Sequence, residues 1–256
     1  YQGIINQPHG MVLITGPTGS GKTTTLYATL EKINSEAQKI ITVEDPVEYQ
    51  LDGITQIQAN ASIGLSFAQG LRSIVRQDPD VLMIGEIRDH ETAEIAIESA
   101  LTGHLVFSTL HTNDAAGAVT RLQDMGVQGY LISSSLLAIQ AQRLVRRVCT
   151  DCAEVHPLNI DEAAALEIDI DSIAEIRRGS GCERCGQTGY RGRVGLYELL
   201  IMTDAIRHHI AAGADANIIR DEAIREGMKT LRQDALEKLS DGMTTPEEVV
   251  RVTRAI

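Results

Sequence analysis

The sequence predicts an α/β fold in which a parallel sheet is covered by helices on both of its faces. Two observations support this prediction. Short, nearly continuous apolar runs alternate with longer segments that have helical spacing. Each apolar run also ends at a glycine or at polar side chains. Because ligands bind at the carboxyl ends of strands in such folds, these endings are expected to share one functional edge of the sheet.

The individual elements follow from these runs. The predicted strands are Met11–Thr15, Lys39–Asp45, Val81–Ile84 and Leu105–Leu110. The predicted helices of the same region are Thr23–Asn34, Phe67–Gln77, His90–Leu101, Asn113–Met125 and Tyr130–Val148. From Thr203 onward the chain is expected to form several short helices. The last of them should start at Thr245, which precedes a proline and two acidic residues.

The composition narrows the class of protein. The 256 residues are 43% hydrophobic and 23% charged, which is ordinary for a globular protein of one large or two small domains. A net charge of −12 and an aromatic content of 3% argue against a surface that wraps or stacks on nucleic acid. No apolar run approaches the roughly 18 residues that a membrane-spanning helix needs.

A complete P-loop motif lies between the first predicted strand and the first predicted helix. Its residues are Gly16-Pro17-Thr18-Gly19-Ser20-Gly21-Lys22-Thr23, followed by Thr24. Glycines let the backbone N–H groups face a phosphate, and the helix adds its positive end. In this interpretation Lys22 reaches the β- and γ-phosphates of ATP, and the Thr23 hydroxyl holds Mg²⁺. The simpler alternative is a glycine-rich turn that fits the pattern by chance.

Acidic residues follow two of the predicted strands. An ATPase needs an acid to order Mg²⁺ and a group to orient the attacking water. Gly85 stands where the usual Walker B pattern has an aspartate, so the predicted acid shifts to Glu86. Glu44 ends the neighbouring strand in the same way. The alternative for both is a helix cap or a solvent-facing carboxylate.

Two histidines, His104 and His111, stand on either side of the strand at Leu105–Leu110. A histidine near phosphates can sense the γ-phosphate or orient a water. The simpler interpretation of each is a hydrogen-bonded histidine with a structural role.

The four cysteines form two Cys-x-x-Cys pairs, at Cys149 and Cys152 and at Cys182 and Cys185. This spacing is a strong zinc signature, in which four thiolates close a tetrahedral shell and leave no position for catalysis. The alternatives are four unligated thiols or two disulfides. We find no secretory signal with the cysteines, which favours a reducing cytoplasmic compartment.

Taken in order, the motifs resemble those of the bacterial secretion traffic ATPases, which drive type II secretion and type IV pilus assembly. The resemblance covers nearly the whole chain. It rests on a Walker A loop, an Asp box, a Walker B strand, a His box and the cysteine pairs. The matching segments after the P-loop are Thr42–Tyr49, Leu71-Arg72, Arg76–Asp80, Gly85–Asp89, Thr102–His104, Thr109–Asn113 and Gly189–Arg193.

The resemblance implies a domain organisation and partners. It predicts a RecA-like ATPase core over residues 1–148, a zinc-binding four-cysteine segment over 149–198 and a C-terminal helical region over 199–256. It further implies a homohexamer, peripheral on the cytoplasmic face of the inner membrane, that works with platform and cytoplasmic-anchor proteins and without nucleic acid. Because the chain starts at Tyr1, just before the P-loop, we expect N-terminal domains to be missing and its ATPase activity alone to be weak.

The resemblance also implies roles for single residues. Glu86 and Glu44 would position Mg²⁺ and the water, and His111 would sense the nucleotide. Arg72 and Arg76 would lie near the nucleotide or a subunit interface, although each could be a solvated helix charge. The implied cofactors are ATP, Mg²⁺ and Zn²⁺.

The sequence leaves more than one kind of motor open. The metal site is similar to that of type II secretion ATPases, so type II secretion is preferred over type IV pilus assembly. A RecA-like nucleic-acid translocase and a zinc-bearing interaction module with an inactive nucleotide site are the remaining alternatives.

Overall fold

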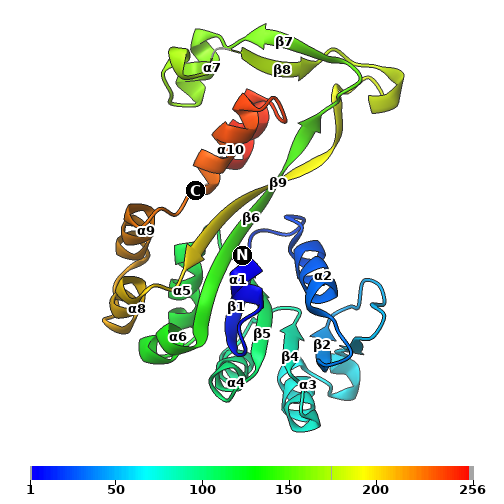
Figure 1. The fold of residues 1–256 in the computed structure, drawn as a ribbon, viewed down its shortest axis with the longest axis vertical. Helices are drawn as coiled ribbons and strands as arrows, with labels where there is room; N and C mark the ends of the chain where they lie inside the picture. The colour runs from blue at the N-terminus through cyan, green and yellow to red at the C-terminus, as the bar shows by residue number, and fades with distance from the viewer. Residues whose placement is uncertain (1, 174, 254–256) are drawn as a thin grey trace. The chain divides into compact units, whose positions relative to one another are not determined.

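The computed structural model describes residues 2–173 and 175–253 (Figure 1). The chain divides into two compact units, the first comprising Tyr1–Ala141 with Leu199–Met228 and the second Gln142–Glu198 with Lys229–Ile256. Two long strands, β6 (Leu136–Val148) and β9 (Tyr190–Ile201), contribute residues to both units. The functional division predicted from the sequence, at residues 148 and 198, stays a prediction. Tyr1, on which the expectation of a longer chain rests, lies outside the described residues.

The predicted α/β architecture with a parallel sheet is confirmed. The strands of unit 1 are β1 (Gly10–Thr15), β2 (Ile40–Glu44), β3 (Thr55–Gln58), β4 (Val81–Ile84) and β5 (Leu105–Leu110). The sheet has the order β3-β2-β4-β5-β1-β6-β9, and β1 to β5 pair in parallel with their neighbours. The residues after β1, β2, β4 and β5 therefore meet at one edge, as the sequence predicts.

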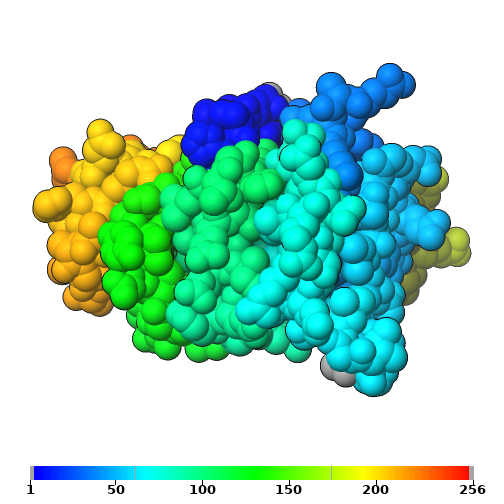
Figure 2. All heavy atoms as spheres, turned by 90° about the horizontal axis from the view of Figure 1, so that it is seen from below, coloured from blue at the N-terminus to red at the C-terminus, as the bar shows by residue number. Residues whose placement is uncertain are grey.

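Unit 1 also contains helices. They are α1 (Gln2–Ile5), α2 (Lys22–Ile33), α3 (Phe67–Ile74), α4 (His90–Leu101), α5 (Ala115–Asp124), α6 (Gly129–Ser135), α8 (Asp204–Ala211) and α9 (Ala216–Arg225), with short 3₁₀ turns at Ala61–Ile63 and Val75–Gln77. Helices α2 and α4 both contact β1 and β5, and α3 contacts β2. Figure 2 shows residues of α3 (cyan), α4 and α6 (green) side by side on the face seen from below.

The starts of these helices explain where ligands can bind. Asp89, Asp114 and Asp215 each accept a backbone N–H of the first turn of the helix that follows them. Such N-caps satisfy donors that have no acceptor within the helix. Helix α2 has no side-chain cap, because Gly21 precedes it; α6 also starts without one. The positive end of α2 is therefore left for a ligand.

Unit 2 contains a two-stranded antiparallel sheet and helices. Its elements are β7 (Ala153–Pro157), α7 (Ile160–Ala165), β8 (Glu175–Gly179), α10 (Leu231–Ser240) and α11 (Pro246–Thr253), with 3₁₀ turns at Ile170–Ser172 and Glu183–Cys185. Glu248 of α11 is 1% exposed and accepts hydrogen bonds from Arg146 and Arg251. This buried ion pair fixes α11 to β6.

One predicted helix is wrong. The segment Tyr130–Val148 has helical spacing, but only Gly129–Ser135 is helical and Leu136–Val148 forms β6. The first part of β6 lies parallel to β1, with Leu13 opposite Ile139. Backbone pairing with a buried strand outweighs local helix propensity here. None of the described helices is long and apolar enough to cross a membrane.

Candidate active site and metal centre

The P-loop turns on glycines between the buried strand β1 and helix α2. Gly16, Gly19 and Gly21 have φ angles of 149°, 78° and 88°, values that favour glycine over other residues. Pro17, Thr18 and Gly19 are exposed at the tip, whereas Ser20 is buried. The loop is thus anchored at both ends and open at its tip.

The start of α2 has the properties of an anion site. A helix leaves its first N–H groups without acceptors in the helix, and its dipole places positive charge there. The Nζ of Lys22 donates to the carbonyls of Gly16 (2.8 Å) and Pro17 (3.2 Å), so the ammonium lies against the loop. Thr23 and Thr24 are exposed in the first turn. A phosphate on this loop would replace weak carbonyl acceptors with a charged one.

A threonine pair connects the P-loop to the segment after β5. Thr15, the last residue of β1, accepts the backbone N–H of Thr112 at 2.8 Å. The hydroxyl oxygens of Thr15 and Thr112 lie 2.7 Å apart. This contact holds the chain around His111 next to the start of the P-loop.

Glu86 and His111 are brought together at the carboxyl edge of the sheet. The Nε2 of His111 lies 3.3 Å from one carboxylate oxygen of Glu86, and Arg88 pairs with the other. The Glu86 side chain is 12% exposed, so a water at this edge can reach it. The Thr109 hydroxyl donates to the Gly85 carbonyl at 2.7 Å and fixes the backbone before Glu86.

Glu44 lies one strand away, but its carboxylate is buried. It is 3% exposed and accepts the Tyr27 hydroxyl, the Thr42 hydroxyl (2.5 Å) and the Gln56 amide (3.1 Å). Burial, and then the hydrogen bond to Glu44, raise the pKa of Tyr27 well above its usual range. Tyr27 therefore keeps its proton and acts as the donor.

The two predicted arginines lie on α3 and the turn after it. Arg72 is exposed and pairs with Glu91 at 2.5 Å. Arg76 is exposed in the 3₁₀ turn Val75–Gln77.

His104 stands apart from the edge that carries Glu86. It precedes β5, at the strand end opposite His111, and its Nδ1 lies 2.9 Å from the Ser99 carbonyl. For His104 the structure supports the simpler, structural interpretation.

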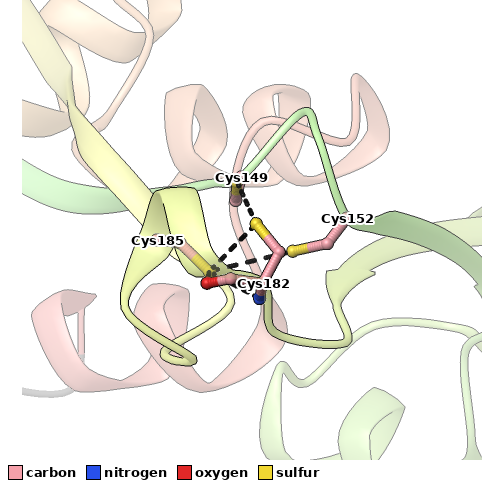
Figure 3. A group of neighbouring side chains, drawn as sticks. All are labelled: Cys149, Cys152, Cys182 and Cys185. Carbon is pink, nitrogen blue, oxygen red and sulfur yellow. Dashed lines mark hydrogen bonds between the residues drawn. The ribbon is translucent and has the colours of Figure 1, made fainter.

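The four cysteines of unit 2 converge on one point (Figure 3). Their sulfurs all lie within 4.8 Å of one another, with 3.9 Å from Cys149 to Cys182 and 3.9 Å from Cys152 to Cys185. Zn–S bonds of about 2.3 Å in a tetrahedron place sulfurs about 3.8 Å apart. The donor set therefore fits zinc. All four thiols are free, so the disulfide alternative is not realised.

Backbone groups favour the thiolate form at Cys185, whereas burial raises the pKa of Cys152 to about 12. Burial raises the pKa of Cys185, but the N–H groups of Cys182 (3.2 Å) and Gly189 (3.3 Å) donate to its sulfur and lower the pKa to about 6. Two glycines allow the chain to close around the cluster. A Cβ on Gly179 would lie 2.2 Å from the Gly189 carbonyl oxygen, which no side chain tolerates.

A family model described as "Type II/IV secretion system protein" matches residues 1–251. The chain belongs to this family. It is 50% identical to the type II secretion system ATPase E of Vibrio cholerae, over 99% of this chain and 50% of that protein. It is 51% identical to the type IV pilus assembly ATPase PilB of Thermus thermophilus, over 99% of this chain and 29% of that protein. The chain spans about half the length of the type II secretion relatives, such as those of Aeromonas hydrophila, Vibrio cholerae and Pectobacterium carotovorum.

Two solved structures, an ATPase and a pilus retraction motor, have the same fold. The Legionella pneumophila ATPase DotB aligns over 100% of this chain and 63% of its own, with a TM-score of 0.73 and 26% identity. The pilus retraction motor PilT, solved with bound ADP, aligns over 98% of this chain and 63% of its own, with a TM-score of 0.72 and 31% identity.

Sequence reasoning for this member of the secretion family missed the partners of Glu44. Tyr27 is not among the site residues predicted from the sequence, and Gln56 belongs to β3, a strand that the sequence did not predict. One signal was present, because Tyr27 stands four residues after Thr23 and so on the same face of α2. Nothing in the short polar run Thr55–Gln58 identified a partner for a buried carboxylate.

Proposed function

We propose that this chain is the motor part of a type II secretion ATPase, which binds ATP with Mg²⁺ and hydrolyses it. One observation carries the proposal. The uncapped start of α2 and the Glu86–His111 pair lie at the carboxyl ends of parallel strands of one sheet. This edge combines an anion site with an acid and a histidine, which are the groups that phosphoryl transfer to water requires.

Each residue of this edge has a proposed role. The P-loop N–H groups and Lys22 bind the phosphates. The exposed Thr23 hydroxyl would hold Mg²⁺, which would supply positive charge to offset the charge of the phosphates. Glu86 orients the attacking water and receives its proton. The water oxygen bonds to the γ-phosphorus while the bond to the bridging oxygen breaks and ADP leaves. His111, in contact with Glu86, senses whether the γ-phosphate is present.

Two arginines are proposed to act across a subunit boundary. Arg72 is already paired with Glu91 in its own chain, which weakens its candidacy. Arg76 is exposed, and we find no ion pair to it within residues 2–173 and 175–253. A positive charge supplied in trans can accelerate phosphoryl transfer by several powers of ten. We therefore favour Arg76 as the residue that a neighbouring subunit would use.

The partners are proposed from the family. A homohexamer at the cytoplasmic face of the inner membrane would transmit ATP turnover to platform and cytoplasmic-anchor proteins. Zn²⁺ held by the four cysteines would stabilise unit 2 and take no part in hydrolysis. Type IV pilus assembly remains a second candidate, because PilB of Thermus thermophilus matches at 51% identity.

ATP turnover per chain, measured over a range of protein concentrations, tests the proposal. We expect a weak rate that rises with concentration, because sites completed between subunits need assembly. Lys22→Ala provides the background, since it removes the ammonium that binds the phosphates. A wild-type rate equal to that background, also in the full-length protein, would contradict the proposal. Stimulation by DNA would instead favour a nucleic-acid translocase.

A further inference from the structure

The buried carboxylate of Glu44 is held by neutral donors. Tyr27 donates to one oxygen, and Thr42 and Gln56 donate to the other. Within the part of the chain that the structure describes, we find no ion pair to Glu44. Burying a charge without a cation is costly unless hydrogen bonds replace its hydration. The hydrogen bonds from the three donors must therefore replace the hydration of the carboxylate. Tyr27 is the donor to one of the two carboxylate oxygens of Glu44.

Tyr27 and Glu44 lie near the start of α2, where the Mg²⁺ site is proposed. Residues four apart on a helix lie on the same face, so Tyr27 lies one turn behind Thr23. The Gly85 N–H donates to the Val43 carbonyl at 2.8 Å, which sets Glu44 beside Gly85 on the neighbouring strand. The usual Walker B aspartate is absent at Gly85, and a buried anion on the adjacent strand stands next to that position.

We propose that Tyr27 is a positioning residue whose hydroxyl holds the Glu44 carboxylate in the orientation from which it acts on the Mg²⁺ site at Thr23. This inference rests on the proposed function. In this arrangement Glu44 has both oxygens occupied by protein donors, so it acts on the bound cation as a fixed negative charge or through a water. A fixed charge stabilises a cation without reorganisation only if its orientation is locked.

If Tyr27 had a purely structural role, loss of its hydroxyl alone would leave kcat and the affinity for Mg²⁺ unchanged. Its ring is fully buried in the core cluster around β1 and β5, so removing the ring would disturb the fold. Tyr27→Phe keeps the ring and removes only the hydroxyl. The edge-on contact with the Tyr49 ring, at 4.7 Å between centroids, is also kept. Tyr49→Phe is a matched control, because Tyr49 is 52% exposed and belongs to the same aromatic pair.

Steady-state kinetics of the full-length protein test the proposal. Because a hydrogen bond to a charged group contributes about 1.5–3 kcal/mol, we expect Tyr27→Phe to lower kcat about 10-fold to 100-fold. The KM for ATP should change by less than about 3-fold, because the phosphate contacts are intact. A titration of Mg²⁺ in the presence of a non-hydrolysable ATP analogue should show about 10-fold weaker binding of the metal. Tyr49→Phe should match the wild type in both measurements.

A double-mutant cycle decides whether Tyr27 acts through Glu44. Once Glu44→Gln is present, adding Tyr27→Phe should lower kcat and Mg²⁺ affinity little further. Additive losses, or a Tyr27→Phe variant with wild-type kcat and Mg²⁺ affinity, would overturn the inference while leaving Lys22-dependent turnover intact. Absence of Lys22-dependent turnover in the wild type would instead overturn the proposed function, and the Mg²⁺ titration would then still test Tyr27.

Discussion

Glycines shape the backbone of both the P-loop and the four-cysteine cluster, but the two regions differ in how exposed they are. In both, glycines with positive φ turn the chain. In the cluster, N–H groups donate to the Cys185 sulfur, and at Gly16–Lys22 the proposed acceptor is a phosphate. The P-loop keeps its tip exposed. The cluster closes on itself, with Cys149 fully buried and all sulfurs within 4.8 Å.

The difference follows from where the anion comes from. The anion proposed for the P-loop binds and is then released, so the hydrogen-bond donors of the loop must stay accessible. The cysteines carry their anions on the chain itself, and a closed shell of four thiolates leaves no position for exchange. We infer that the first region is built for turnover and the second for stability. The predictions below test this contrast, from the largest expected effect to the smallest.

Removal of zinc should have the largest effect. Structural zinc contributes on the order of 10 kcal/mol in small metal-dependent domains. Chelation, or Cys182→Ser, should therefore abolish hydrogen-exchange protection of the amides between Cys149 and Gly189. Amides of β1 and β5 should stay protected, because their apolar core contains no metal ligand. An unchanged exchange pattern after chelation would show that the cluster does not depend on metal.

The second prediction concerns turnover at the open region. Glu86→Gln should lower kcat by about 10²-fold to 10⁴-fold, because the group that orients and deprotonates water is lost. Nucleotide affinity should change little, since the P-loop is untouched. Glu94→Gln, an exposed acid on α4, is the control. If both variants hydrolyse ATP like the wild type, Glu86 is not the essential acid.

The third prediction concerns pH and unit 2. Burial raises the pKa of Glu248, but hydrogen bonds from Arg251 and Arg146 lower it to about 2, from an ordinary 4.5. This depressed pKa corresponds to about 3 kcal/mol of stability, present above about pH 4.5 and lost as the pH falls towards 2.

The measurement for Glu248 is the free energy of unfolding between pH 7 and pH 2. Glu248→Gln should destabilise the protein at pH 7 and should show a smaller loss on acidification than the wild type. Glu175→Gln, at an exposed position of β8, is the control. Parallel pH profiles for the wild type and Glu248→Gln would refute the assignment.

The smallest effect is expected at the threonine pair. Thr15→Val keeps the shape of the side chain and removes the acceptor of the Thr112 N–H, which should cost about 1–2 kcal/mol in chemical denaturation. If the pair also holds His111 in place, kcat should fall more than stability alone explains. Thr55→Val, at an exposed position of β3, should do neither.

Local patterns predicted the strands of the ATPase edge well. Val81–Ile84 and Leu105–Leu110 coincide with β4 and β5, because buried parallel strands form nearly continuous apolar runs. The polar residues after them could then be placed together by the parallel topology alone. Likewise, the spacing of the cysteines predicted a cluster whose sulfurs do meet.

Other elements depend on contacts that a single segment does not reveal. Leu136–Val148 mixes apolar residues with glutamine and arginine, and its pairing with β1 and β9 makes it a strand. The hairpin β7–β8 consists largely of exposed residues and joins segments separated by a helix. The bonds of Glu44 to Tyr27 and Gln56 cross three elements, so no local pattern could predict them.

The close approach of Gly179 and Gly189 has a consequence for how this protein can change over generations. A Cβ on either residue would lie within 2.4 Å of the other's backbone carbonyl oxygen, so neither position tolerates a side chain, whatever residue stands at the other. The same close approach of two backbones keeps both positions as glycine. In a lineage that abandoned the cysteines, the reason for holding these two backbones together would disappear. Selection on both glycines would then relax at the same time.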